Sequence, residues 1–140
     1  MPTPPPLATE PGRLLILDDD VAIGQLLVFV AQRAGYEARL CGDPAVFFDT
    51  VQQWAPTHLA IDLAMPGMHG LDVMRRLAAA ECTAWVIVSS GAGRAEIDAA
   101  MDQAQVLGLR TAGALTKPFS LASVRALLAQ TALDPGSETP

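Results

Sequence analysis

The chain has few cysteines and few basic residues, and each shortage excludes a class of protein. Only two of its 140 residues are cysteines, Cys41 and Cys82, and no CxxC motif or metal-ligand spacing joins them. We therefore expect reduced, structural thiols in a cytosolic protein, and no disulfide framework. Nine Lys and Arg residues against fifteen Asp and Glu are scattered along the chain, which argues against binding nucleic acid through this domain.

Long apolar runs are also missing, so the sequence predicts a cytoplasmic protein that does not cross a membrane. Its first residues, MPTPPPLATEPG, lack the charged and apolar regions of a secretion signal. Residues 1–12 are proline-rich and are expected to form a flexible tail, and residues 133–140 a second flexible tail or linker stub. The remaining residues, 13–132, are enough for one domain with a sizeable core.

Apolar runs alternate with helical patterns through this central region. The predicted strands cover residues 13–18, 37–41, 58–62, 84–90 and 112–116. The predicted helices cover about 20–34, 43–54, 71–80 and 95–107, and a last one begins at Ser120, with Leu121, Val124, Leu127 and Leu128 on its apolar face. This alternation predicts a doubly wound α/β fold, in which helices cover both faces of a parallel sheet.

Reactive side chains follow the predicted strands at their carboxyl ends, where such sheets bind ligands. These residues are Asp18, Asp19 and Asp20 after the first strand, Asp62 after the third, Ser90 after the fourth and Lys117 after the fifth. Clustered carboxylates repel one another, and Mg²⁺, which prefers oxygen ligands, would relieve that repulsion. A carboxylate beside the cation could accept a phosphoryl group whose charge a lysine and a hydroxyl stabilise. Asp20 is assigned to capping the following helix in preference to binding metal.

The motifs LILDDD, HLAIDLAMPGMHGLDV, VIVSSG and LTKPF, in this order, resemble those of the receiver domain of bacterial two-component response regulators. The resemblance implies a flavodoxin-like (βα)5 sandwich with strand order 2-1-3-4-5, and a cis peptide before Pro118. It implies that Asp62 accepts a phosphoryl group from a histidine kinase or a histidine phosphotransfer protein. It further implies that Mg²⁺ is held by Asp18, Asp19, Asp62 and the carbonyl of Ala64, that Ser90 is the switch hydroxyl, and that Lys117 contacts the phosphate. Such a domain catalyses only its own phosphorylation and dephosphorylation.

Some positions depart from the family pattern. Ala114 stands where an aromatic switch residue is usual, and Ala64 and Ala92 are small at positions that help to control water access to the phosphate. The segment between Ser90 and Lys117, which contains AQVLGLRTAGAL, is longer than expected. That extension resembles receivers that act with EAL phosphodiesterase output domains, and the resemblance leaves homodimerisation open.

Two other functions are compatible with parts of the pattern. A Mg²⁺-dependent phosphatase of the haloacid dehalogenase type would use Asp18 as nucleophile with Asp20, but it usually needs a cap domain for which this chain has no spare length. A flavodoxin-like cofactor binder would need a loop rich in Ser, Thr and Gly after the first strand. The sequence DDDVAIG at that place would repel a phosphate.

Overall fold

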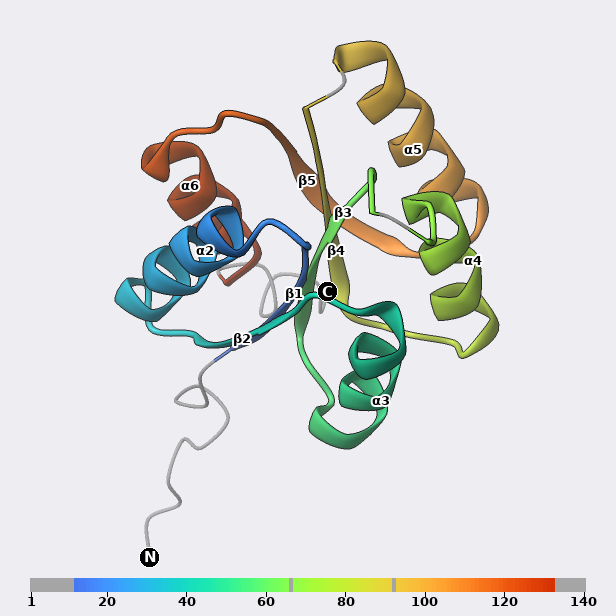
Figure 1. Ribbon diagram of the computed structural model, residues 1–140, viewed down its shortest axis with the longest axis horizontal. Helices are drawn as coiled ribbons and strands as arrows, with labels where there is room; N and C mark the ends of the chain where they lie inside the picture. Colours follow the sequence, from blue (N-terminus) through green and yellow to red (C-terminus); the bar gives the residue numbers. More distant parts are fainter. Residues whose placement is uncertain (1–11, 66, 92, 133–140) are drawn as a thin grey trace, which may run out of the picture.

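The computed structural model describes residues 12–65, 67–91 and 93–132 (Figure 1). The elements in chain order are β1 Arg13–Leu17, α2 Val21–Arg33, β2 Glu37–Cys41, α3 Pro44–Trp54, β3 His58–Asp62, α4 Gly70–Ala79, β4 Trp85–Ser90, α5 Arg94–Val106, β5 Arg110–Thr116 and α6 Leu121–Ala132. The two predicted tails fall outside the described residues except for Gly12, and Ala92 also falls outside them. Among the helices of the described part, none is both long and apolar enough to span a membrane.

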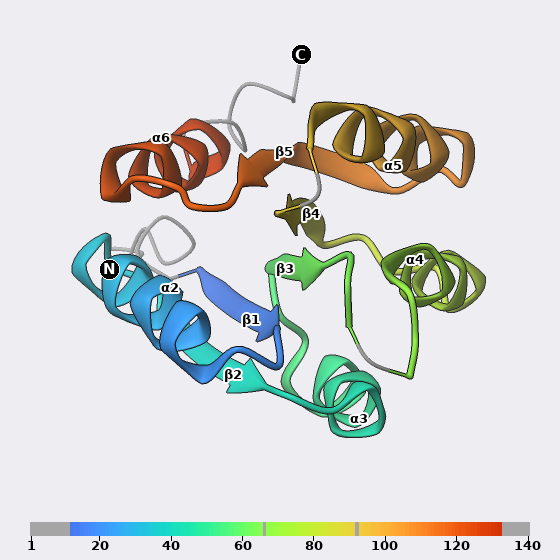
Figure 2. The same cartoon turned by 45° about the horizontal axis from the view of Figure 1, so that its top comes forward.

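The five strands form one parallel sheet in the order β2-β1-β3-β4-β5, which confirms the predicted fold class and strand order. Alternate side chains of the central strands point to opposite faces, so each face carries its own apolar cluster. Leu15 and Leu17 of β1 pack in the cluster with Phe47 of α3, whereas Leu14 and Ile16 pack in the cluster with Val30 of α2. Figure 2 shows the result: α3, α4 and α5 cover one face, and α2 and α6 cover the other.

Most predicted element boundaries agree with the structure to within one or two residues. The helix starts at Asp20 and Asp43 are confirmed, since each carboxylate accepts a hydrogen bond from a backbone N–H of the first helical turn. The cis peptide between Lys117 and Pro118 is present as expected. The two cysteines are free, as predicted.

Two predictions about the last strand and helix are wrong in part. Strand β5 begins at Arg110 and not at residue 112, because its pairing with β4 skips a residue: Thr111 lies opposite Val86 and Gly113 opposite Ile87. This β-bulge takes up part of the extra length before Lys117. Leu121 was expected to be buried on the apolar face of α6 with Val124 and Leu128, but it is 42% exposed, and it is the first residue of the helix.

Candidate functional site

Three aspartates meet at the carboxyl ends of β1 and β3. Asp18 and Asp62 are buried, with 1% and 4% of their surface exposed, and Asp19 is exposed beside them. One carboxylate oxygen from each of the three lies within 4.8 Å of the others. Neighbouring parallel strands end at the same edge of the sheet, and this topology brings residues from distant parts of the chain together.

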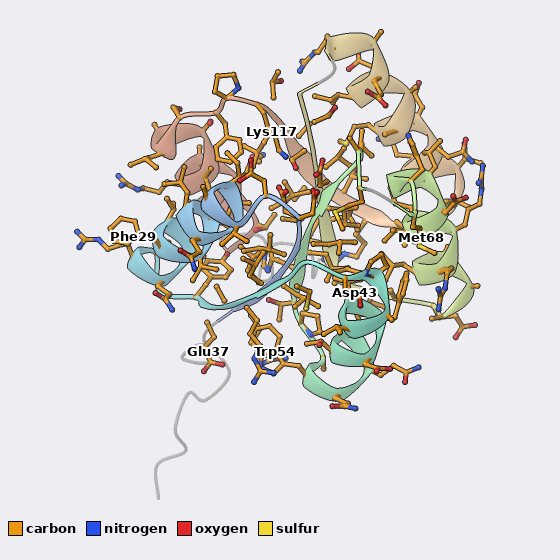
Figure 3. The ribbon with its side chains drawn as sticks, in the orientation of Figure 1. Phe29, Glu37, Asp43, Trp54, Met68 and Lys117 are labelled. Carbon is orange, nitrogen blue, oxygen red and sulfur yellow. The ribbon has the colours of Figure 1, made fainter. Side chains whose placement is uncertain are left out.

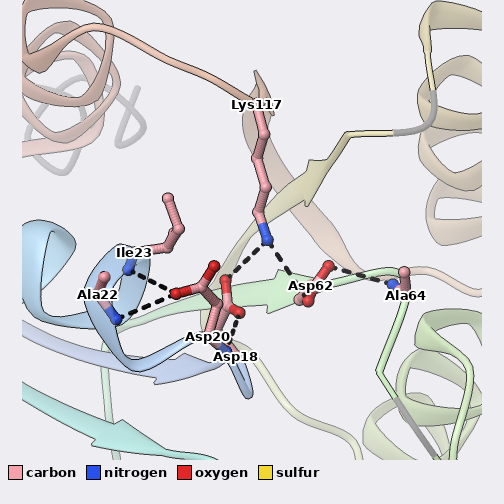
Figure 4. Close-up of polar contacts among 7 residues, drawn as sticks. All are labelled: Asp18, Asp20, Ala22, Ile23, Asp62, Ala64 and Lys117. Atoms are coloured by element: carbon pink, nitrogen blue, oxygen red, sulfur yellow. Dashed lines mark hydrogen bonds and ion pairs between the residues drawn. The ribbon is translucent and has the colours of Figure 1, made fainter.

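Lys117 reaches into this cluster from the end of β5 (Figure 4). Its Nζ lies 3.0 Å from Oδ2 of Asp18 and 3.5 Å from Oδ2 of Asp62. The second oxygens accept backbone hydrogen bonds: Oδ1 of Asp18 from the N–H of Asp20 at 2.9 Å, and Oδ1 of Asp62 from the N–H of Ala64 at 3.1 Å. The buried carboxylates are therefore held in place from two sides, by the ammonium group and by the loops that follow their strands.

Asp20 has a different role from its two neighbours. Its Oδ1 accepts hydrogen bonds from the N–H groups of Ala22 and Ile23 at 3.1 and 3.2 Å, so it caps α2 (Figure 4). This confirms its assignment to capping, and Asp20 is absent from the three-carboxylate cluster. The backbone N–H of Asp20 nevertheless contributes to the site through its bond to Asp18.

The electrostatics of the cluster are dominated by burial. Burial raises the pKa of Asp18, and the nearby charge of Asp62 raises it further, although the N–H of Asp20 and the ammonium of Lys117 act in the opposite direction. Burial alone would lower the pKa of Lys117, but its hydrogen bond to Asp18 and the two carboxylate charges outweigh that effect, so this pKa is raised. One lysine thus pairs with two of the three clustered acids, so negative charge in the cluster remains uncompensated.

A divalent cation fits this donor set. All three side chains offer carboxylate oxygens, the ligand type that Mg²⁺ prefers, and they converge from two strands on one point. The exposure of Asp19 opens one side of the cluster to solvent, and Mg²⁺ usually retains several water ligands. Asp18, Asp19 and Asp62, which the sequence predicted as metal ligands, therefore lie close enough together to offer their carboxylate oxygens to one ion.

Ser90 lies at the end of β4, between β3 and β5, and is fully buried. Its carbonyl accepts a hydrogen bond from the N–H of Lys117 at 2.9 Å, which fixes the start of the β5–α6 connection against β4. Next to it, the carbonyl of Ser89 accepts one from the N–H of Leu63 at 3.0 Å. Ser90 therefore stands at the same sheet edge as the acids and next to the backbone of Lys117.

His69 is an exposed residue with a structural role at the start of α4. Its Nδ1 accepts a hydrogen bond from the N–H of Leu71 at 3.1 Å and caps α4. Its Nε2 lies 3.6 Å from a carboxylate oxygen of Glu96, in the first turn of α5. Its position just before a helical pattern was a signal for a cap, but the contact with α5 depends on tertiary structure.

Comparison with known proteins gives a consistent result. The model of the family described as "Response regulator receiver domain" matches residues 14–129. The DNA-binding response regulator MtrA of Mycolicibacterium paratuberculosis is 30% identical over 122 residues, which cover 83% of this chain and 51% of that protein. The response regulator MprA of Mycobacterium sp. (strain KMS) is 29% identical over 134 residues, covering 93% and 56%. The chain thus spans about half the length of the curated relatives it matches.

Solved structures give the same fold at lower sequence identity. The signal receiver domain of a putative Luxo repressor protein from Vibrio parahaemolyticus superposes with a TM-score of 0.80 at 17% identity, covering 92% of this chain and 95% of that one. The chemotaxis response regulator CheY4 of Vibrio cholerae superposes with a TM-score of 0.73 at 20% identity, covering 86% and 98%.

These matches support neither a phosphatase of the haloacid dehalogenase type nor a flavodoxin-like cofactor binder. Receiver domains generally bind Mg²⁺ and work with a kinase and an output domain, without turning over a substrate of their own. The chain belongs to the response regulator receiver domain family, and its domain is a phosphorylation-dependent switch of a two-component system.

Proposed function

We propose that Asp62 is the residue that accepts the phosphoryl group. The observation that carries this proposal is the position of Lys117, whose ammonium lies within 4 Å of both Asp62 and Asp18. Asp62 ends the central strand β3, and a group transferred to it would lie between the lysine and the buried end of β4. Asp18 directly follows β1 and is hydrogen-bonded more closely to the lysine, which suits a fixed ligand better than a nucleophile.

Asp18, Asp19 and Asp62 would hold Mg²⁺, with the backbone carbonyl of Ala64 as the fourth protein ligand. When bound, the ion would neutralise the acids and favour the approach of a phosphate dianion to them. Their fit to the ion is supported by the convergence of three carboxylate oxygens within 4.8 Å. The N–H of Ala64 already binds Asp62, so the loop that would supply the carbonyl is tied to the phosphoacceptor.

The protein's own groups account for the rest of the transfer. A carboxylate oxygen of Asp62 attacks the phosphorus atom as the bond from phosphorus to the donor breaks, and the donor leaves with that electron pair. Lys117 then shifts from bridging two carboxylates to contacting the negative oxygens of the phosphoryl group. The hydroxyl of Ser90 would contact the same phosphoryl group, and this contact would change the positions of β4 and β5. The domain would catalyse only this transfer and the later hydrolysis of the acyl phosphate, in which water attacks the phosphorus atom and Asp62 leaves as a carboxylate.

A histidine kinase or histidine phosphotransfer protein would supply the phosphoryl group. Residues 13–132 would form the receiver domain, with residues 1–12 and 133–140 as tails or linker stubs. We infer an output part that contacts DNA in preference to an EAL phosphodiesterase, because the MtrA relatives are named DNA-binding and are about twice as long as the matched region. The acidic receiver, with a chain net charge of −6, would not itself contact nucleic acid.

Intact mass spectrometry after incubation with Mg²⁺ and acetyl phosphate tests this proposal. We expect the wild-type protein to gain one phosphoryl group, and Asp62→Asn to gain none while keeping its circular dichroism spectrum. Asp72→Asn is a matched control, because Asp72 is an exposed carboxylate on α4 whose ion pair is with Arg75, away from the three-carboxylate cluster. Full phosphorylation of Asp62→Asn would overturn the assignment.

A further inference from the structure

A hollow of about 560 Å³ lies between α3 and the loop that joins β3 to α4. Its inner wall is apolar, because Phe48 of α3 and Met68 of the loop both pack against the core. Its rim is charged and is formed by Asp43, Asp49 and Arg76. Asp43 at the start of α3 and Met68 in the loop are labelled in Figure 3.

The rim carries an excess of negative charge. Arg76 is its single cation, and its Cζ lies 3.9 Å from the centroid of the Phe48 ring, so the guanidinium is stacked on the floor. Oδ1 of Asp43 caps α3 by accepting from the N–H of Ala45. Within the described part of the chain, no ion pair joins Asp43 or Asp49 to a basic side chain. The hollow therefore suits an occupant that places an apolar side chain next to a cation.

The openness of the hollow points to a protein surface as the occupant. Small-molecule sites bury roughly 70–90% of their ligand. Here Asp43, Asp49 and Arg76 are all exposed at the rim, so a small ligand would keep one side in solvent. A side chain on the helix of a partner protein can instead bind with only its outer end inside the hollow.

The chain itself presents a matching pair on α2. Of the large apolar residues exposed in the described part, Phe29 is the aromatic one, with 53% of its surface exposed. The Cζ of Arg33, one turn further along, lies 5.8 Å from its ring centroid, so an aromatic ring and a cation are presented together. Helices α2 and α3 cover opposite faces of the sheet, so one copy cannot place this pair in its own hollow (Figure 2).

We propose that the protein associates head to tail, with Phe29 of one copy seated in the hollow of the next. Phe29 would cover Phe48 and Met68, and Arg33 would face the carboxylate of Asp49. Two aspartates would then meet two arginines, Arg76 and Arg33, and the charge of the contact would balance. In a pair of copies, one copy would keep an unused hollow and the other an unused α2, so further copies could add at both ends and the contact would not close as a symmetric dimer.

Sedimentation velocity over a concentration series that reaches the millimolar range tests this contact, since small interfaces of this kind are weak. We expect the average mass of the wild-type protein to rise with concentration, and Asp49→Arg and Phe29→Ser to stay monomeric. Matched controls are Asp98→Arg, with the same charge change on α5, and Val106→Ser, which removes another exposed apolar side chain. Both controls should associate like the wild type. So should Asp62→Asn, which separates this contact from the phosphorylation site.

Mixing the two variants gives the sharper result. Asp49→Arg keeps an intact α2 and Phe29→Ser keeps an intact hollow, so the mixture should form one-to-one dimers and nothing larger. Should Asp49→Arg fail to fold, Arg33→Glu removes the same charge pair from the other side. A wild-type protein that stays monomeric at millimolar concentration, or variants that associate as it does, would overturn the proposal.

Discussion

Both ends of strand β3 carry buried polar side chains, but the two ends differ in how fully the partners of these side chains satisfy them. At the amino end, His58 is 5% exposed and each ring nitrogen has a hydroxyl partner: Nδ1 lies 2.8 Å from Oγ1 of Thr57 and Nε2 2.6 Å from Oγ1 of Thr131. At the carboxyl end, Asp62 shares one lysine with Asp18, and a third acid, Asp19, lies beside them. The first arrangement is complete without a ligand, and the second lacks positive charge.

This contrast separates a structural group from a functional one. Burial lowers the pKa of His58 to about 4, and the positive charge of Arg110 acts in the same direction. The ring is therefore neutral near pH 7, and two hydroxyl groups are sufficient hydrogen-bond partners for it. The bond to Thr131 ties α6 to the central strand. The acids at the other end retain a cost of burial that a cation would relieve. Substitutions at the amino end should therefore affect stability, and those at the carboxyl end should affect metal binding and phosphorylation.

The largest expected effect concerns the metal. Asp19→Ala should lower Mg²⁺ affinity by at least about tenfold, because it removes one of the three carboxylates proposed to bind the ion. Asp20→Ala should leave that affinity nearly unchanged but lower the free energy of unfolding by about 1 kcal/mol, because it removes the cap of α2. Isothermal titration with Mg²⁺ and urea unfolding measure the two effects. Equal loss of affinity in both variants would show that the roles of the aspartates are wrongly divided.

The pH dependence of stability should differ in sign between the two ends. The folded-state pKa of His58 is lowered from 6.5 to about 4. The contribution of neutral His58 to the free energy of unfolding is therefore fully present above pH 6.5 and is lost as the pH falls toward 4. The raised pKa of Asp18 has the opposite effect: its cost is largest at neutral pH and is relieved as acid protonates it. His58→Gln should therefore reduce the loss of stability in acid, by about 3 kcal/mol over that window.

Asp18→Asn should instead raise the free energy of unfolding at neutral pH and steepen its fall toward pH 4. Urea unfolding at a series of pH values measures both variants against the wild type. Parallel curves for all three proteins would contradict the assignment of these two groups.

A smaller effect is expected when one hydroxyl is removed at the amino end. Thr131→Val keeps the shape of the side chain but leaves Nε2 of His58 buried without its partner. Such a loss costs about 1–2 kcal/mol of stability. Thr50→Val is a control, because Thr50 is less buried and its hydroxyl bonds within its own helix to the carbonyl of Val46. If Thr131→Val slowed phosphorylation without changing stability, the division between the two ends would fail.

The sequence was most informative where a local pattern determines the structure. Asp20 and Asp43 could be assigned as caps because the preference acts within one helical turn, and the acids could be placed at one edge because strands alternate with helices. The partners of His58 could not be found in this way, since Thr131 is far along the chain and only packing of α6 brings it near. The bulge in β5 and the exposure of Leu121 likewise depend on tertiary packing, because they are set by how β5 pairs with β4 and how α6 packs on the sheet.

The smallest expected effect is the change in dynamics that follows phosphorylation. Ala114 lies in β5 opposite Val88, half-buried, so no aromatic ring can turn inward there when the serine moves. We therefore expect the phosphate to be sensed through the hydroxyl of Ser90 and the backbone that follows it. The pairing of β5 with β4 is already irregular between Val86 and Ile87, and an irregular ladder opens at lower cost than a regular one. We therefore expect beryllofluoride, a phosphate mimic, to change amide hydrogen exchange most in residues 90–113, with Ser90→Ala reducing that change. If exchange changed mainly in α2 and α3 while residues 90–113 stayed constant, the signal would have to leave the site through β1 and β2 instead.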